Sequence, residues 1–276
     1  MADSPQILLR KLRLTPKHSW GQNFLGDDEV LLRIVEEAMI VPTDHVVELG
    51  AGLGHLTRHL LDTGAKITAV ERDRDMVEAL KTMELPGLTL VEGNAAELDF
   101  AKTATADQVI VVGNLPYHLT SSILFEVLDQ ADHVVRALFT LQKEVVTRLS
   151  ADPGGREYGL LSVLLGLRFH VEHCFDVPSE YFHPPPKVDS AVVRLSRRSV
   201  PKAKVIDEKR FRQVVKAGFA QRRKTLINSL KSDPRLVEAY DLLGALERAG
   251  IDPKRRAETL SVEEFAALEC SLDVSP

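Results

Sequence analysis

The sequence predicts an α/β protein of Rossmann-like architecture, with a mostly parallel sheet, helices on both of its faces and a small all-α C-terminal domain. Three observations predict it. Five apolar strand-like segments between residues 45 and 141 alternate with segments whose apolar residues recur at helical spacing. A glycine-rich segment follows the first strand, and beyond residue 206 only helical spacing remains. Alternating strands and helices typically form a parallel sheet covered on both faces.

The alternation begins with a helix after Asp27, a residue type that caps helix N-termini. We expect strands at residues 45–49, 66–71, 88–91, 108–113 and 134–141, with helices around Leu56–Leu61, Met76–Leu80 and Ile123–Leu128 between them. The fourth strand has the dense β-branched composition of a strand buried on both faces.

A loop at residues 152–156 and a long apolar helix from about Tyr158 to Phe169 follow. Two late strands at 171–177 and 189–195 are joined through three consecutive prolines at 184–186. Composition changes near Ser196, where a linker begins. We therefore expect a basic, mobile N-terminal arm at 1–26, a main domain at 27–198, a linker at 199–206 and a helical domain at 207–276.

Composition is ordinary for a soluble globular protein, with 44% hydrophobic and 27% charged residues among 276. No apolar run is long enough to span a membrane, and the start of the chain does not resemble an export signal. Two distant cysteines, Cys174 and Cys270, predict neither a disulfide framework nor a thiolate zinc site. A cytoplasmic location and no membrane partner are therefore expected.

Charge is distributed unevenly along the chain, whose net charge is −5. Residues 196–231 carry 12 basic and 2 acidic side chains, and the first 18 residues carry 4 basic and 1 acidic. The remainder of the chain is therefore strongly acidic. Two basic patches on an acidic body can bind polyanions locally, although a solvated basic helix face is the alternative interpretation.

The first chemical motif is the segment Glu48-Leu-Gly-Ala-Gly-Leu-Gly54, which lies between a strand and a helix. Glycines at such a turn let the backbone approach a ligand below a helix N-terminus. Glu71 ends the next strand, where an acidic side chain can accept hydrogen bonds from a ribose diol. The glycine spacing differs from the G-x-G-x-x-G of nicotinamide enzymes and is typical of S-adenosylmethionine loops.

The second motif is Asn114-Leu115-Pro116-Tyr117, directly after the fourth strand. It is expected at the same sheet edge as the glycine loop, where α/β proteins bind ligands. Carbonyl groups of Asn114 and its neighbour can accept both protons of an adenine amino group, and Tyr117 offers a face for base stacking. The alternative is an ordinary turn with a buried tyrosine.

Three further segments are less specific when considered alone. Residues 21–25 (GQNFL) form a polar stretch around Phe24, and an aromatic pair at 181–182 precedes the prolines. Arg222, Arg223 and Lys224 form a basic cluster at the start of a helix. At least two of these cations must face solvent or phosphate, because they cannot all face a core.

Together these stretches resemble the rRNA adenine N6,N6-dimethyltransferases, and most closely their bacterial small-subunit (16S) branch. The matching segments are GQNFL (21–25), ELGAGLG (48–54), NLPY (114–117), LQKEVVTRL (141–149), PPPKVDSAVVRL (184–195) and QRRKTLINSL (221–230). They cover nearly the whole chain. The resemblance implies a class I methyltransferase fold with a late antiparallel strand, S-adenosyl-L-methionine as cofactor, small ribosomal subunit RNA as substrate and a monomeric state.

The resemblance also implies roles for individual residues. Cofactor contacts would come from Asn23, Leu25, Gly50, Gly52, Glu71, Asn94 and Asn114. Asn94 stands where the family usually has an aspartate that contacts the cofactor's adenine amino group. The target adenine would meet Asn114, Leu115 and Pro116 and would stack between Tyr117 and Phe182. Arg222, Arg223 and Lys224 would contact RNA.

Other functions remain open at this stage. A large-subunit methyltransferase of the resistance type would share the fold, and a non-catalytic ribosome-assembly factor would share the basic patches. A nicotinamide-dependent dehydrogenase is disfavoured by the glycine spacing, and amide-nitrogen methyltransferases more often carry proline where this chain has Leu115. His55 and His59 lack the glutamate of a helical zinc motif, so no metal is expected.

Overall fold

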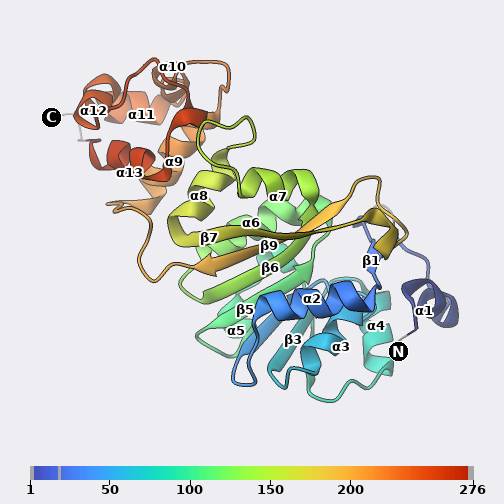
Figure 1. Cartoon of the computed structure of the whole chain (residues 1–276). Helices are drawn as coiled ribbons and strands as arrows, with labels where there is room; N and C mark the ends of the chain where they lie inside the picture. The colour runs from blue at the N-terminus through green and yellow to red at the C-terminus, as the bar shows by residue number, and fades with distance from the viewer. Residues whose placement is uncertain (1–2, 18–19, 273–276) are drawn as a thin grey trace. The chain divides into compact units, whose positions relative to one another are not determined.

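The computed structural model describes residues 3–17 and 20–272, and these divide between two compact units (Figure 1). The first unit contains Met1–Val146 and Glu172–Arg197, and the second contains Thr147–Val171 and Arg198–Pro276. Within the described residues, no helix is both long and apolar enough to cross a lipid bilayer.

A seven-stranded sheet, counted over the described residues, has the order β4-β3-β2-β5-β6-β9-β7 (Figure 1). Its strands are β2 (His45–Leu49), β3 (Lys66–Glu71), β4 (Leu88–Glu92), β5 (Val109–Asn114), β6 (Val134–Gln142), β7 (Phe169–Val177) and β9 (Ser190–Arg197). Strands β4 to β6 in this order pair in parallel, whereas β9 runs antiparallel to β6. The predicted mostly parallel sheet with a late antiparallel strand is confirmed.

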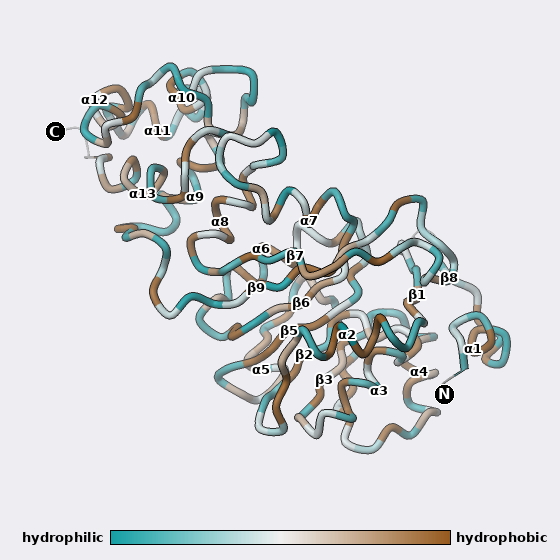
Figure 2. Tube along the Cα trace, in the orientation of Figure 1, coloured by the Kyte–Doolittle hydropathy of each residue, from teal (hydrophilic) through white to brown (hydrophobic). Residues whose placement is uncertain are grey.

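The strands form where the sequence has unbroken β-branched segments. Val46 and Val47 of β2 are fully buried, and Val46 pairs with Ile67 of β3 and Ile110 of β5. Side chains from α2 (Asp28–Ala38) and α3 (His55–Leu61) complete this core. In Figure 2 the apolar and polar residues alternate along α2, which is the pattern of a helix with one buried face.

The remaining helices of the first unit are short, and four single 3₁₀ turns accompany the helices and strands of the described residues. The helices are α1 (Pro5–Leu12), α4 (Arg74–Thr82), α5 (Phe100–Ala104) and α6 (Thr120–Asp129), and α7 (Lys143–Leu149) leads into the second unit. The turns are η2 (Ala95–Glu97), η3 (Tyr117–Leu119), η4 (Ser179–Tyr181) and η5 (Ala257–Thr259). Helices cover both faces of the sheet, as the sequence predicts.

The N-terminal arm differs from the expectation of a mobile segment, because residues 5–12 form helix α1. Ser4 caps the helix, and Pro5 stands at its first position, where the missing N–H costs nothing. Leu8 and Leu9 are buried against Phe24, Leu53 and Met76. This apolar contact with the main domain holds the helix in place.

The second unit is helical, as predicted. Its helices are α8 (Leu160–Arg168), α9 (Glu208–Phe219), α10 (Leu226–Leu230), α11 (Pro234–Ala239), α12 (Leu242–Arg248) and α13 (Val262–Cys270). The predicted boundary needs one correction, because residues 147–171 group with these helices and not with 27–198. The physical reason is packing: the Tyr158 ring lies 6.3 Å from the Phe219 ring, and a Cβ at Gly166 of α8 would lie 3.2 Å from the Val262 side chain of α13.

Candidate active site

A pocket of the first unit lies where the parallel strands β2, β3, β4 and β5 end. Its volume is about 320 Å³, which lies in the range of small-molecule sites. Ten of the residues that the sequence predicts as cofactor or catalytic residues line it: Asn23, Leu25, Gly50, Gly52, Glu71, Asn94, Asn114, Leu115, Pro116 and Tyr117. The carboxyl ends of neighbouring parallel strands bring these distant segments together.

The glycine loop after β2 forms one wall of the pocket. Gly50, Gly52 and Gly54 have φ angles of +75°, +54° and +75°, which side chains with a Cβ adopt only with strain. A Cβ at Gly52 would also lie 3.1 Å from the Phe24 ring. These positions therefore need glycine both for the turn and for the close approach of the arm.

Glu71 at the end of β3 is held rigidly at the pocket wall. One carboxylate oxygen, Oε2, accepts a hydrogen bond of 2.8 Å from the Gly52 N–H. The other accepts from the N–H groups of Arg72 and Asp73, at 2.8 and 2.7 Å. Burial raises the pKa of Glu71, and these three donors oppose the rise. Oε1 thus accepts two bonds and Oε2 only one, so Oε2 can still accept a hydrogen bond from a ribose hydroxyl.

Asn114 ends β5 on the opposite side of the glycine loop. Its Nδ2 donates a hydrogen bond of 2.9 Å to the carbonyl of Asn23 in the arm. Because the nitrogen is used in this way, Oδ1 is the end of the amide left to accept a proton from a bound amine. The arm thus sets the orientation of this amide.

The rest of the tetrapeptide is equally constrained. The Leu115 N–H bonds to the Thr140 carbonyl of β6, and the Tyr117 hydroxyl lies 2.8 Å from Oγ of Ser190 on β9. Burial raises the pKa of Tyr117, so its ring is a neutral phenol at pH 7. The chain turns here because Pro116 precedes η3. A flat ring fixed at its far end is suited to base stacking.

Asn94 follows β4 and caps the 3₁₀ turn η2. Its Oδ1 accepts from the Ala96 N–H at 3.2 Å, and its Nδ2 donates to Oε1 of Glu97 at 2.8 Å. The side chain lines the pocket, beside the Glu71 wall. The amide therefore presents an oxygen with one remaining lone pair.

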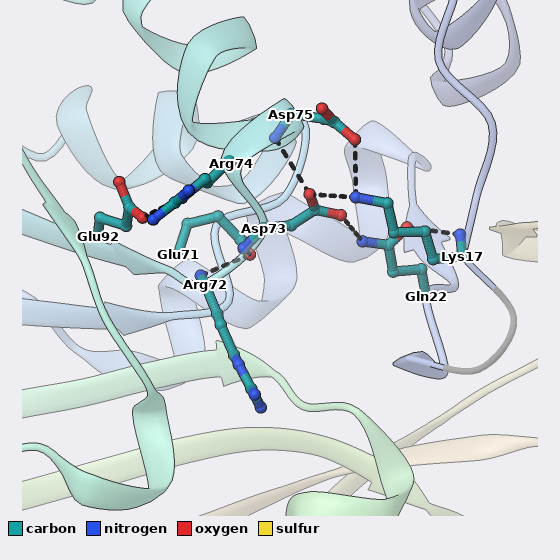
Figure 3. A network of polar contacts seen from close by, with 8 residues as sticks. All are labelled: Lys17, Gln22, Glu71, Arg72, Asp73, Arg74, Asp75 and Glu92. Atoms are coloured by element: carbon teal, nitrogen blue, oxygen red, sulfur yellow. Dashed lines mark hydrogen bonds and ion pairs between the residues drawn. The ribbon is translucent and has the colours of Figure 1, made fainter.

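The arm is tied to the β3–α4 turn by a charged network, shown in Figure 3. Nζ of Lys17 contacts Asp73 and Asp75 at 2.6 and 2.7 Å, and Nε2 of Gln22 donates to Asp73 at 2.7 Å. Burial of the Asp73 carboxyl acts to raise its pKa, but the bonds from Lys17 and Gln22 hold that pKa below its ordinary value. Asp73 is thus one of the points at which the arm is attached to the main domain.

The arm closes the pocket with both polar and apolar groups. Trp20 lines the pocket, and its ring lies 5.2 Å from Nζ of Lys17 and 5.3 Å from the Arg72 guanidinium. Leu25 on β1 (Phe24–Leu25) pairs antiparallel with Phe182 on β8 (Phe182–His183). The arm therefore meets the segment that precedes the three prolines.

Glu48 is a pocket residue that the sequence reasoning did not count as a site residue. It is buried within the glycine motif, and its Oε2 has no hydrogen-bond partner among the described residues. Burial raises its pKa to about 7. A buried acid at the end of an otherwise apolar strand is the signal that points to it.

Two groups of predicted site residues lie outside the pocket lining. Phe182 is 4% exposed and packs in the core beside α2 and α3. Arg222, Arg223 and Lys224 belong to the second unit and are exposed, on a turn before α10 and not on the helix itself. Arg222 donates to the carbonyl of Arg156 and lies 3.7 Å from Glu258.

His55 and His59 of α3 each contact another group of the first unit. Among residues 3–17 and 20–272, no group of three or more histidine, cysteine, aspartate or glutamate side chains is placed to hold a metal ion. Nε2 of His55 contacts the Asp3 carbonyl, and His59 contacts Asp28 at 3.3 Å. Both histidines thus make polar contacts within the first unit.

The pocket fits the chemistry of S-adenosyl-L-methionine. A glycine cradle, a buried carboxylate beside it and a second carboxylate with an unpartnered oxygen match a ligand with a ribose diol and positive charge. Asn94 adds an acceptor at one end and Asn114 at the other.

Comparison with known proteins gives consistent results. Residues 13–273 match the family described as ribosomal RNA adenine dimethylase. The chain is 60% identical over 270 residues to ribosomal RNA small subunit methyltransferase A of Myxococcus xanthus, covering 98% of this chain and 95% of that protein. It is 51% identical to the protein of the same name from Anaeromyxobacter sp. strain K, with 98% of each chain covered.

Two solved structures are similar over most of the chain. A dimethyladenosine transferase from Plasmodium falciparum has a TM-score of 0.77 at 25% identity, covering 89% of this chain and 95% of that one. The 23S rRNA methyltransferase ErmE has a TM-score of 0.70 at 28% identity, covering 91% and 99%. Both support the class I methyltransferase fold.

Proposed function

The chain belongs to the ribosomal RNA adenine dimethylase family, and on this premise we propose that it dimethylates the N6 amino group of adenosines in small-subunit ribosomal RNA, using S-adenosyl-L-methionine. The observation that carries the proposal is the pairing of a ribose-binding carboxylate, Glu71, with an oriented acceptor amide, Asn114, in one pocket. The proposed role in ribosome assembly follows from this substrate.

The cofactor is held along the strand ends. Glu71 would hold the ribose, the backbone of Gly50 and Gly52 would hold the amino-acid part, and Asn94 would contact the adenine. Asn23 and Leu25 close the pocket from the arm. When bound, S-adenosyl-L-methionine supplies a methyl group made electrophilic by its positively charged sulfur.

The tetrapeptide prepares the target amine. The lone pair of an adenine N6 is delocalised into the ring, so the amine is a poor nucleophile. Oδ1 of Asn114 and the Leu115 carbonyl accept hydrogen bonds from the two N–H groups of the adenine amine. These bonds direct the nitrogen lone pair into the pocket. Pro116 stiffens this turn. Positioning is the main contribution of these residues, and the proton released from the methylated amine goes to water.

Two aromatic rings hold the target base. The Tyr117 ring is fixed by Ser190 and stacks on one face of the adenine. Phe182 stacks on the other face. Since its side chain is 4% exposed, this role requires the ring to turn out of the core when RNA binds. The adenine itself must leave its RNA stack to reach the pocket.

Different segments of the chain would bind the cofactor and the RNA. The arm at 1–26 and the rest of the first unit, residues 27–146 and 172–197 of the predicted domain 27–198, bind the cofactor and transfer the methyl group. The helices at 207–276, beyond the linker at 199–206, bind RNA through Arg222, Arg223 and Lys224. We propose that the protein acts as a monomer. The cytoplasm, where ribosomal subunits are assembled, is the proposed location.

The decisive experiment supplies labelled S-adenosyl-L-methionine with unmethylated small subunits, and in parallel with large subunits and with naked RNA. Dimethyladenosine on small subunits alone is the expected product. Label on large subunits would instead indicate a methyltransferase of the resistance type. Absence of label with the cofactor bound would indicate a protein that binds RNA without modifying it.

Asn114→Ala separates catalysis from binding. Loss of the acceptor amide is expected to lower the rate of methyl transfer by about 100-fold or more, as for other donors or acceptors that act on the reacting group. RNA affinity is expected to stay within about twofold, because the proposed RNA contacts lie in the second unit. Equal losses of rate and RNA affinity would contradict the assigned role.

A further inference from the structure

The order of the strands determines which end of the cofactor meets which residue, provided that the proposed function holds. Strands β4, β3, β2 and β5 are consecutive neighbours, so Asn94, Glu71, the glycine loop and Asn114 lie in a row. S-adenosyl-L-methionine is built as base, ribose and methionine in sequence. With the ribose at Glu71 and the reacting methyl group near Asn114, the adenine lies toward β4, at Asn94.

An amide at position 94 can take two orientations that differ in which end faces the adenine, whereas the two ends of a carboxylate are equivalent. Either oxygen of a carboxylate can accept from the adenine amino group. An amide has one acceptor and one donor, and a half-turn about its last bond exchanges them. In the wrong orientation the amide NH₂ would face the adenine NH₂, and neither donor would have an acceptor.

We propose that Glu97 fixes the orientation of the Asn94 amide and thereby selects a cofactor whose base carries an amino group. Oε1 of Glu97 accepts from Nδ2 of Asn94 at 2.8 Å, which a flipped amide could not provide. The Ala96 N–H donates to Oδ1 at 3.2 Å and favours the same orientation. Glu97 does not line the pocket, so it is a positioning residue.

The test compares two ligands that differ at one group. S-adenosylhomocysteine carries the amino group, and S-inosylhomocysteine has a carbonyl oxygen in its place. Calorimetric titration of the full chain with each ligand gives the preference for adenine. Glu97→Ala is expected to weaken binding of the adenine ligand about three- to tenfold, the effect of one hydrogen bond. Binding of the inosine ligand is expected to stay the same or to tighten, because a freed amide can donate from its NH₂ to the carbonyl oxygen.

Two further variants separate orientation from charge and from local folding. Glu97→Gln keeps an acceptor oxygen within reach of Asn94 and is expected to restore the adenine preference to within about twofold of the wild type. Glu92→Ala removes an exposed acid at the end of β4, the strand that precedes Asn94. The Glu92 side chain pairs with Arg74. This control is expected to leave the preference unchanged.

A double-mutant cycle removes the difference between the two orientations. Asn94→Asp gives a carboxylate that accepts in either orientation, so Glu97 has nothing left to orient. In that background Glu97→Ala is expected to cause no loss of affinity for the adenine ligand. It is even expected to tighten binding, because two neighbouring carboxylates repel each other.

The outcomes separate the role of Glu97 from the position of the cofactor's adenine. If Glu97→Ala weakens both ligands equally, Glu97 only supports the local fold and the inference is wrong. If Asn94→Ala leaves the adenine preference unchanged, the inference is wrong because the base does not lie at Asn94, and that part of the proposed function falls with it. If Asn94→Ala abolishes the preference but Glu97→Ala does not, only the role of Glu97 is wrong.

Discussion

Glu48 carries an unsatisfied oxygen at the bottom of the cofactor pocket. Its side chain is 1% exposed, and the nearby carboxylate of Glu71 adds repulsion to the cost of burial. Both effects favour the protonated form, and they raise the pKa to about 7 from an ordinary value of 4.5. A cationic ligand would reverse this balance by stabilising the carboxylate.

Stability is therefore expected to fall as pH rises through this window. Because the folded state holds the Glu48 proton more tightly than the unfolded chain, the stabilisation is fully present below pH 4.5 and is lost by about pH 7. Each pH unit in that window costs the folded state about 1 kcal/mol. Urea unfolding of the wild type and of Glu48→Gln at several pH values measures the effect.

The glutamine variant serves as the comparison because it cannot titrate. The difference in unfolding free energy between the variant and the wild type is expected to rise between pH 4.5 and 7 in favour of the variant and then stay constant. A difference that does not depend on pH would show that Glu48 is already ionised when buried.

Single residues were predictable from sequence only where a motif and a strand end coincided. Glu71 and Asn114 were identified because each ends an apolar strand, and the structure brings both to the pocket. The contact of Asn114 with Asn23 was not predictable, because 91 residues separate the two. Phe182 illustrates the limit: its sequence position suggests stacking, whereas its burial depends on its pairing with Leu25.

At the scale of elements, the arm is expected to depend on one ion-pair network. Lys17→Met removes the cation that bridges Asp73 and Asp75. The buried Asp73 carboxylate then loses its charged partner, which destabilises the docked arm. Faster hydrogen exchange at residues 20–25 and about three- to tenfold weaker cofactor binding are expected, since Asn23 and Leu25 belong to the arm.

Lys11→Met provides a matched control for the arm variant. Lys11 also forms an ion pair, with Asp3 at 2.6 Å, but both side chains are well exposed. Such a surface pair contributes little. Exchange in the arm and cofactor affinity are both expected to stay at wild-type levels. Similar effects of the two substitutions would mean that positive charge, and not the Asp73 contact, holds the arm.

Strand β5 is expected to tolerate no side chain at Gly113. A Cβ there would lie 2.6 Å from the Leu49 carbonyl oxygen of β2 and 2.9 Å from the Leu115 side chain. Gly113→Ala must therefore push β2 and β5 apart, at a cost of about 1–3 kcal/mol in the unfolding free energy. Chemical denaturation measures this cost. A loss below about 0.5 kcal/mol would show that the strands can shift freely.

Elements were predictable when their own sequence pattern determined them. Strand β5 was found because a strand buried on both faces is continuously apolar. Helix α1 was missed, since a segment of only eight residues does not form a stable helix alone. Its stability comes from Leu8 and Leu9 packing against Leu53 and Met76, and that contact is invisible in a local pattern.

At the scale of the whole molecule, charge and chemistry are carried by different parts of the chain. The predicted boundary at residue 198 followed a change in composition. The two compact units are instead determined by side-chain packing. Residues 147–171 group with the C-terminal helices because the apolar side chains of α8 are buried within the second unit. The second unit thus combines this buried apolar helix with the exposed basic cluster before α10.

RNA affinity is expected to depend on salt through this second unit. Arg223 and Lys224 are exposed, and no ion pair of either is found within the described part of the chain, whereas Arg222 lies near Glu258. If both cations contact phosphates, replacing them by alanine removes about two counterion-release events. The magnitude of the slope of log affinity against log salt should then decrease by about 1.4–1.8, measured with small-subunit RNA.

The double variant Arg74→Ala, Lys81→Ala is the control. It loses the same charge from two exposed ion pairs of the first unit and should keep the wild-type slope. Identical slopes for all three proteins would mean that the cluster is only a solvated surface, and that RNA is bound elsewhere.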